Sequence, residues 1–444
     1  MKHTLLPHQI EDAAFMAARK FCGNWSKMRT GKTLTALEAV RLLNPASQCN
    51  AVIIVGPPIS LSMWKEVFEQ HVGGFAQIIR SGKQQIIRDN DAVIMSYAIA
   101  AKRRDELKAL GAKVLILDES HALKTISAKR TKAILGKYGL CESVDHCYML
   151  SGTPSTRYSD DLFSFLCRAD AAGMKERVGK VDMSRFRLRY CITQKKKFSA
   201  AQRFPIEVVV GNRNLTELNE WMFDGGLAVR RESVEGMPPL TVNRLQVDLE
   251  VDPELRKMLK ELEKQSISQI QEDIAKKDEH LATIRRKLGV AKVKHSVTEI
   301  VDRIEAGTGP ILCGAWHTDV VDELRDRIRD AGLNVAHIDG RVGAARRDAC
   351  VDGFNDGTLD VLIGQISAMG VAIDLSGGGG HICMVEEDWS PAINEQFMYR
   401  MMNFGETSHP VHCDIFGSDT KLDKAVRRIN ASKSRGHDTM MGDE

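Results

Sequence analysis

The stretch Met28-Arg29-Thr30-Gly31-Lys32-Thr33 decides how the rest of the chain is interpreted, because it lies between a hydrophobic stretch and a segment with helical periodicity. Gly31 lets the backbone turn closely around a phosphate, Lys32 supplies a positive charge for phosphate oxygens, and Thr33 offers a hydroxyl to Mg²⁺. The strict phosphate-loop pattern has glycine at position 26, where this chain has Ser26. The stretch alone therefore leaves two interpretations open, a nucleotide site or an ordinary turn before a helix.

Length and composition set the broad class. A chain of 444 residues is too long for one compact core and predicts two or three domains. Its net charge of +3 is small, so a nucleic-acid surface must be a local patch. The ten cysteines are scattered singly, without zinc-site spacing, and no stretch is long and apolar enough for a membrane helix. We therefore expect a soluble, cytoplasmic protein with reduced cysteines and no membrane partner.

Hydrophobic patterning predicts an α/β fold with a parallel sheet. A helix is expected after Pro7, carrying Gln9, whose amide offers both a donor and an acceptor to an adenine edge. A second helix is expected to follow the Gly-Lys-Thr triplet, and its first turn would face the phosphates. Continuous apolar runs at residues 51–55 and 92–95 fit buried parallel strands separated by helices.

The strongest stretch is an acidic pair after a third apolar run, at residues 114–117. This run places Asp118 and Glu119 at the carboxyl end of a predicted strand, where open parallel sheets bind ligands. We expect Asp118 to hold the hydration shell of Mg²⁺ and Glu119 to orient and deprotonate the attacking water. The alternative is a pair with a structural role only.

A further apolar run, at residues 148–150, ends in Ser151-Gly152-Thr153-Pro154. Ser151 and Thr153 can hydrogen-bond His121 or Asp118 and relay events at the γ-phosphate. In isolation this turn means little, and its meaning comes from its place in the order of the motifs.

The order of these motifs looks like that of superfamily-two helicases, and within them it is most similar to the Swi/Snf-type DNA translocases. The Ser-Gly-Thr-Pro variant resembles the annealing-helicase group of that branch. The resemblance implies two tandem RecA-like lobes, each a parallel sheet flanked by helices, with ATP between them and duplex DNA across their shared face. It is carried by Gln9, Gly31-Lys32-Thr33, Gly56-Pro57-Pro58 with Trp64, Ser96-Tyr97, Asp118-Glu119-Ser120-His121 and Ser151-Gly152-Thr153-Pro154.

Roles follow from the resemblance. It implies that Lys32, Asp118, Glu119, Gln396 and Arg400 take part in hydrolysis of ATP, with Mg²⁺ held by Thr33 and Asp118, and that His121, Ser151 and Thr153 couple the motifs. In the last motif Asn403 stands where a second arginine is usual, which leaves open whether Arg400 suffices or hydrolysis is weak. The nucleotide-binding positions implied are Gln9, Met28, Arg29, Thr30, Gly31, Lys32, Thr33, Gly370 and Asp374.

The second half of the chain supplies the other lobe. Arg230-Arg231 followed by Pro238-Pro239 resembles the segment between lobes, so we expect lobes at residues 1–235 and 236–444. The second begins with a helical segment at 252–294, opened by Asp252 as N-cap. Its charged part is either solvated or follows phosphates. The strand and helix rhythm returns with segments at 311–314, 337–340 and 361–364.

Basic residues cluster just before the lobe boundary. Arg185 and the run Lys195-Lys196-Lys197, with aromatic residues interleaved, are candidates for sequence-independent contacts to DNA phosphates. The resemblance adds Ser96 to the DNA-binding positions. The alternative is a solvated face.

Together these patterns predict a DNA-dependent ATPase, with ATP and Mg²⁺ as cofactors, that moves along or remodels duplex or branched DNA in replication, recombination or repair. Two alternatives stay open: a nucleotide-gated DNA clamp, because of Asn403, and an accessory subunit that recruits a nuclease or recombinase. The compact length suggests a phage or bacterial source.

Overall fold

A computed structural model describes residues 4–43, 51–87, 89–156, 158–197, 204–275, 278–369, 373–402 and 408–443, with only the backbone of Lys196 and Ala275. Two predicted positions, Gly370 and Asn403, lie outside these ranges. The chain forms two compact units: unit 1 comprises residues 1–234 and 435–444, and unit 2 comprises residues 235–434. Across the described helices, none has the length and apolar character needed to cross a membrane.

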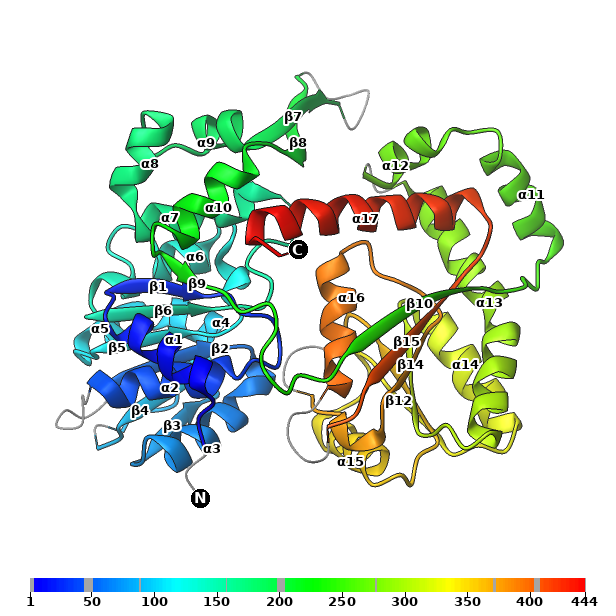
Figure 1. Ribbon diagram of the computed structural model, residues 1–444, viewed down its shortest axis with the longest axis horizontal. Coiled ribbons are helices and arrows are strands. Elements are labelled where there is room, and N and C mark those ends of the chain that lie inside the picture. The colour runs from blue at the N-terminus through cyan, green and yellow to red at the C-terminus, as the bar shows by residue number, and fades with distance from the viewer. Residues whose placement is uncertain are drawn as a thin grey trace. The chain divides into compact units, whose positions relative to one another are not determined.

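Unit 1 is built on a parallel sheet in the order β3-β4-β2-β5-β6-β1-β9 (Figure 1). The central strands are buried at every position, as expected for strands covered on both faces. The strands are β1 (Phe21–Asn24), β2 (Val52–Gly56), β3 (Ala76–Ile79), β4 (Ala92–Ser96), β5 (Val114–Leu117), β6 (His146–Leu150) and β9 (Ala228–Val229).

Helices cover both faces of this sheet. Since alternate strand residues point to opposite sides, each strand contributes side chains to both of the resulting cores. Ile54 and Ile116 pack with α1, α2 and α3, whereas Ile53 and Leu117 belong to the core on the other face. The helices are α1 (Pro7–Ala17), α2 (Lys32–Leu43), α3 (Leu61–His71), α4 (Tyr97–Lys102), α5 (Arg104–Ala109), α6 (Lys129–Ile134), α7 (Phe163–Ala169), α8 (Ala171–Val178), α9 (Met183–Tyr190) and α10 (Leu215–Phe223).

An antiparallel hairpin lies outside the main sheet of unit 1. It pairs β7 (Cys191–Lys196) with β8 (Ile206–Asn212) and follows α9 directly (Figure 1). The predicted basic run 195–197 therefore lies at the far end of β7.

Unit 2 has its own parallel sheet, in the order β10-β15-β14-β11-β13-β12. Helices α13 (Glu279–Glu305) and α14 (Thr318–Asp330) cover one face, where Val293, Val320 and Leu324 pack on strand residues. Phe397 of α16 (Pro391–Met398) packs against Gly314 and Gly364, because a Cβ at either glycine would lie within 3 Å of its ring. The strands are β10 (Leu240–Gln246), β11 (Ile311–Ala315), β12 (Val335–Ile338), β13 (Val361–Gln365), β14 (His381–Met384) and β15 (Val411–Gly417).

The described residues of the predicted helical segment at the start of unit 2 form three helices. Asp252 caps the first as expected, accepting a hydrogen bond from the backbone of Leu255 (2.6 Å). The charges of α13 are not all solvated. Arg285 and Lys292 are buried, and Lys292 pairs with Asp423 (2.8 Å). The helices of this unit are α11 (Pro253–Leu262), α12 (Ile267–Ala275), α13 (Glu279–Glu305), α14 (Thr318–Asp330), α15 (Ala344–Asn355), α16 (Pro391–Met398) and the start of α17 (Lys421–Met441).

The last ten residues, 435–444, group with unit 1, whereas the sequence predicts them as part of the second lobe. Met440 and Met441, at the end of α17, are buried in the core of unit 1. The predicted fold class is confirmed: both units are α/β, with parallel sheets flanked by helices.

Candidate active site

The predicted motifs of unit 1 meet at one edge of its sheet. Strands β5, β6 and β1 are neighbours and parallel, and their last residues pair in register, Leu117 with Met149 and Leu150 with Asn24. The segments that follow these strands are the acidic pair, the Ser-Gly-Thr turn and the phosphate loop. They therefore lie side by side at the carboxyl edge, where parallel sheets bind ligands.

The phosphate loop has a tightly folded backbone. Arg29 and Gly31 both have positive φ, 63° and 81°, so the chain turns sharply before α2 begins at Lys32. The ammonium of Lys32 donates to the carbonyls of Ser26 (2.7 Å) and Lys27 (2.8 Å). Loop and lysine thus form one hydrogen-bonded unit at the N-terminus of a helix, where anions bind favourably.

Helix α1 packs against this loop. A Cβ at Gly31 would lie 1.9 Å from Nε2 of Gln9, so a side chain at this position would displace the amide of Gln9. The side-chain oxygen of Gln9 accepts a hydrogen bond from the backbone of Leu6 (2.9 Å), and the ring of His8 lies 2.9 Å from the carbonyl oxygen of Thr30. Gln9 is thereby fixed beside the phosphate loop, and its role in binding adenine stays a prediction.

Asp118 is held on two sides. Its Oδ2 accepts a hydrogen bond from the indole nitrogen of Trp64 (2.8 Å), and its carbonyl oxygen accepts one from the hydroxyl of Tyr97 (2.6 Å). Burial raises the pKa of Asp118 to about 6, with a further rise from the charge of Glu119, while Trp64 and Lys32 oppose the shift. Two adjacent carboxyl groups in this environment favour a cation beside them.

Glu119 leaves the strand in a left-handed conformation, with φ 49° and ψ 50°. Its Oε2 lies 3.2 Å from Nδ1 of His121, and that nitrogen also lies 3.2 Å from the hydroxyl of Ser151. The hydroxyl of Ser151 in turn accepts a hydrogen bond from the backbone of Thr153 (3.1 Å). The structure thus brings together the general-base candidate and all three predicted coupling residues.

The Ser-Gly-Thr turn also packs against the phosphate loop. A Cβ at Gly152 would lie 2.9 Å from the side chain of Met28 and 3.4 Å from its backbone nitrogen. The turn therefore contacts the loop directly and, through Ser151, the acidic segment.

The residues present fit a nucleotide with Mg²⁺. Lys32 and Thr33 occupy the first turn of α2, and Asp118 supplies a buried carboxylate from a neighbouring part of the same sheet edge. Hydroxyl and carboxylate oxygens are the ligands Mg²⁺ prefers alongside phosphate oxygens. Thr33 and Asp118 would hold the metal, which would supply positive charge for the phosphates.

Unit 2 holds the predicted site residues Asp374, Gln396 and Arg400. Gln396 lies on α16, and Arg400 lies in the 3₁₀ turn Tyr399–Met401 that follows. A guanidinium nitrogen of Arg400 donates to the carbonyl of Ile373 (3.3 Å), next to Asp374. The carboxylate of Asp374 accepts a hydrogen bond from the backbone of Ser376 (3.1 Å). Arg400 and the Asp374 segment, predicted from separate motifs, are therefore neighbours within this unit.

The predicted DNA-binding residues lie apart from one another. Arg185 is exposed on α9, and Lys195 and Lys197 are exposed at the end of β7. Ser96 is buried at the carboxyl end of β4. Two other basic residues of α9 are paired with carboxylates: Arg187 with Asp160 (2.7 Å) and Arg189 with Glu217 (2.7 Å). The lysine run is therefore the main candidate for contacts to DNA phosphates.

Several residues that shape the site are not evident from the sequence. The motifs that contain Trp64 and Tyr97 give these side chains no role, yet both hold Asp118. Arg230-Arg231 marks only a boundary in the sequence, yet the backbone of Arg231 accepts a hydrogen bond from Lys27 (2.8 Å) and donates one to Ser26 (3.0 Å). Trp64 lies 54 positions before Asp118, so no local pattern in the sequence joins the two residues.

In this parallel sheet a glycine-lysine loop follows β1, and an acidic pair follows β5, which lies two strands away across the sheet. This is the arrangement of a phosphate-loop nucleotide-hydrolysing protein. Comparisons with known proteins narrow this class. Residues 24–171 match the SNF2-related domain. That range contains the phosphate loop, the acidic pair and the Ser-Gly-Thr turn.

Sequence relatives extend over most of the chain. The SWI/SNF-related matrix-associated actin-dependent regulator of chromatin subfamily A-like protein 1 homolog of Caenorhabditis elegans is 26% identical over 387 residues, 84% of this chain and 53% of that protein. The DNA repair and recombination protein RAD54B of Mus musculus is 22% identical over 500 residues, 92% of this chain and 53% of that protein. The chain thus spans about half the length of these relatives.

A solved structure with a similar chain is the SWI2/SNF2 ATPase core of Sulfolobus solfataricus in complex with dsDNA. It is 16% identical, has a TM-score of 0.44 and covers 94% of this chain and 88% of its own. The chain is thus similar to SWI/SNF-related proteins over most of its length and to the SNF2-related domain at residues 24–171.

Proposed function

We propose that this protein is a DNA-dependent ATPase that couples hydrolysis of ATP to movement along, or remodelling of, duplex or branched DNA in replication, recombination or repair. The observation that carries the proposal is the meeting of three motifs at one sheet edge. There Lys32 lies at the start of α2, Asp118 and Glu119 follow β5, and Ser151 links to His121. The names of the relatives, a chromatin regulator and a DNA repair and recombination protein, support DNA as the partner.

In the proposed mechanism each side chain has a separate task. Lys32 binds phosphate oxygens, and Asp118, fixed by Trp64 and Tyr97, orients its carboxylate for the metal. Glu119 accepts the proton of the attacking water. Bound Mg²⁺ supplies positive charge that stabilises the phosphoryl transfer. His121 and Ser151 connect Glu119 to the turn that packs on the phosphate loop.

The first experiment is steady-state ATP hydrolysis by the purified chain without DNA and with single-stranded, duplex or forked DNA. Strong stimulation by duplex or forked DNA supports the proposal, and the absence of hydrolysis under all four conditions contradicts it. Glu119→Gln should lower kcat by about 10²- to 10⁴-fold while nucleotide still binds, because only proton transfer is removed. Full turnover by this variant would remove Glu119 from the mechanism.

The lysine run at the end of β7 is the proposed contact to DNA phosphates. Replacing Lys195, Lys196 and Lys197 by alanine should weaken binding to all sequences and reduce the slope of log K against log salt by up to about 2.7, since each phosphate contact contributes about 0.9. The matched control replaces three exposed lysines of unit 2, Lys257, Lys260 and Lys264, and should leave the slope unchanged. An unchanged slope in the first variant would show that the run is a solvated face.

A second candidate is the nucleotide-gated clamp, favoured by asparagine at position 403 of the sequence. It predicts DNA binding that depends on ATP, with hydrolysis appearing only after Asn403→Arg. The annealing-helicase subgroup, the phage or bacterial source and the cytoplasmic location stay predictions.

A further inference from the structure

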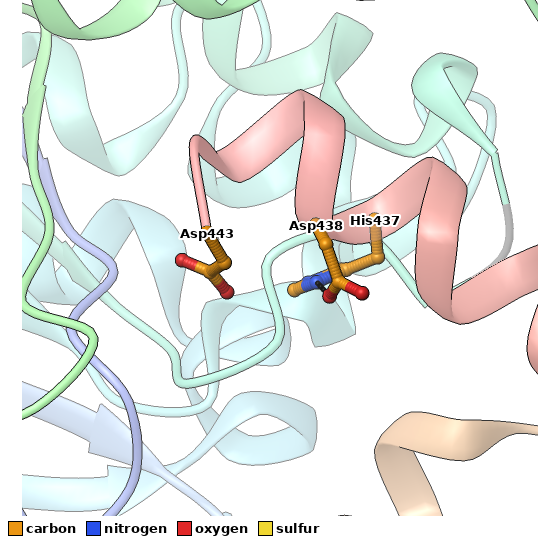
Figure 2. A group of neighbouring side chains, drawn as sticks. All are labelled: His437, Asp438 and Asp443. Atoms are coloured by element: carbon orange, nitrogen blue, oxygen red, sulfur yellow. Dashed lines mark ion pairs between the residues drawn. The ribbon is translucent and has the colours of Figure 1, made fainter.

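Asp443 lies in unit 1, just beyond the end of α17, and its position is fixed by packing. Gly442 reverses the chain with φ +75°, and the backbone nitrogen of Asp443 donates to the carbonyl of Asp438 (2.9 Å). Met440 is 1% exposed, and its carbonyl accepts a hydrogen bond from Asn219 (3.0 Å). Figure 2 shows Asp443 at the end of this helix, near Asp438 and His437.

The carboxylate of Asp443 forms a two-point pair with Arg230. Nε of Arg230 donates to one carboxylate oxygen (2.6 Å), and Nη2 donates to the other. The two side chains are only 5% and 4% exposed. Burial raises the pKa of the Asp443 carboxyl, but the hydrogen bonds and charge of Arg230, with the charge of Lys27, outweigh it and hold the pKa below its usual range.

The pair is connected to the segment that leads into the phosphate loop. The remaining guanidinium nitrogen of Arg230 donates to the carbonyl of Trp25 (2.6 Å). The ammonium of Lys27 lies 3.6 Å from the same Asp443 carboxylate. The backbone nitrogens of Trp25 and Lys27 donate to the segment around Arg230, at the carbonyls of Val229 and Arg231 (both 2.8 Å).

The segment held in this way in turn holds the phosphate-binding lysine. The carbonyls of Ser26 and Lys27 accept the hydrogen bonds of the Lys32 ammonium. A displacement of residues 25–27 therefore moves the acceptors that orient Lys32. The contacts thus connect Asp443 to Arg230 and Arg230 to the carbonyl of Trp25. The next two residues along the backbone, 26 and 27, bind Lys32 through their carbonyls.

We propose that Asp443 is a positioning residue for the phosphate loop, which it controls through Arg230. The proposal rests on the proposed function, in which Lys32 binds the phosphates of ATP. Asp443 and Arg230 are separated by 213 positions in the sequence. Under this proposal a residue far along the sequence from the phosphate loop helps to position the nucleotide site of unit 1.

A metal ion is the other explanation for this group of side chains, since ligand atoms of His437, Asp438 and Asp443 lie within 4.8 Å of one another. Both oxygens of Asp443 are occupied by Arg230, however, and an ion there would lie against the guanidinium. The ion pair with Arg230 therefore accounts for Asp443 better than a metal does.

The test compares Asp443→Asn with wild type in the full chain. The variant keeps the size of the side chain and removes its charge. We expect the Kd for a fluorescent ADP analogue with Mg²⁺ to rise about tenfold, because one charge-assisted contact of the loop is weakened. We also expect KM for ATP to rise while kcat stays within about twofold, because the groups that react are untouched. Backbone amides of residues 25–32 should exchange hydrogen faster.

Asp160→Asn is the matched control, since Asp160 also accepts two hydrogen bonds from one arginine, Arg187, in unit 1 (2.9 and 2.7 Å). It should leave nucleotide affinity and loop exchange at wild-type values. Arg230→Lys is the second variant, should Asp443→Asn fail to fold, and it should also raise Kd and loop exchange.

Wild-type affinity and wild-type loop exchange in both variants would overturn the proposal, as would equal effects in the control. If the wild type binds no nucleotide, the proposed function fails, whereas the exchange comparison still decides whether Asp443 positions the loop.

Discussion

Gly31 offers the sharpest test of the phosphate-loop geometry. Its φ of +81° costs a residue with a side chain about 1–2 kcal/mol, and a Cβ there would overlap Nε2 of Gln9. Gln9 is buried and must move, which breaks its hydrogen bond with Leu6 and leaves a buried amide poorly paired, at about 1–2 kcal/mol more. Gly31→Ala should therefore lower the free energy of unfolding by about 2–4 kcal/mol.

Gly73 provides the matched control because it has a similar φ of +91°, and a Cβ added there would meet nothing within 4 Å. Gly73→Ala should cost only the backbone strain, about 1–2 kcal/mol. For a unit of this size these values correspond to a Tm lower by about 6–12 °C for Gly31→Ala and about 3–6 °C for Gly73→Ala. The difference between the two variants measures the contact between Gln9 and the loop.

Thermal unfolding and titration with a fluorescent ADP analogue are measured on both variants and the wild type. Gly73→Ala should bind nucleotide as the wild type does, and Gly31→Ala should bind at least about tenfold more weakly, since both Gln9 and the loop are displaced. Equal Tm values for the two variants, together with wild-type affinity in Gly31→Ala, would refute the packing of Gln9 against the loop.

Two other predictions concern unit 1. Trp64→Phe removes the hydrogen bond to Asp118 and should raise the Mg²⁺ concentration for half-maximal hydrolysis by about tenfold. Trp221→Phe is the control, because it loses a similar hydrogen bond to Asp170 and should leave this Mg²⁺ concentration unchanged. Equal effects of the two substitutions would contradict the role of Trp64. Glu38→Gln should lower stability by about 1–3 kcal/mol at pH 7. Hydrogen bonds from Arg41, and to a smaller extent from His71, hold the pKa of Glu38 below 4.5. The difference in unfolding free energy between the wild type and Glu38→Gln should therefore shrink as the pH falls below 4.5. A difference that stays constant with pH in urea unfolding would contradict this prediction.

The sequence predicts the central strands of unit 1 well. Continuous apolar runs at 51–55, 92–95 and 114–117 correspond to β2, β4 and β5, because strands covered on both faces need no polar positions. Edge elements are not predictable in the same way. The short strand β9 has two residues, and its place beside β1 is set by tertiary pairing that leaves no local pattern.

Charge patterns are the least informative part of the sequence. The basic positions of α13 suggest a solvated face or a phosphate-binding row, but Arg285 stacks over the ring of Trp389 (4.1 Å) and Lys292 pairs with Asp423. Both partners lie far along the chain from α13. A sequence shows that a residue is charged, but the fold decides which opposite charge or ring lies against it, and buried charges must be paired.

Ser26 shows why a departure from a motif need not weaken a site. Among the described residues of the phosphate loop, positive φ occurs at Arg29 and Gly31, so position 26 does not require glycine. The hydroxyl of Ser26 accepts a hydrogen bond from the backbone of Arg231 (3.0 Å), and its carbonyl accepts one from Lys32 (2.7 Å). Serine at this position therefore joins the loop to the segment that carries Arg230. The residue that weakens the motif in the sequence makes one of the contacts by which distant residues hold the loop, so the conformation of this loop depends on the rest of the unit and not on the loop residues alone.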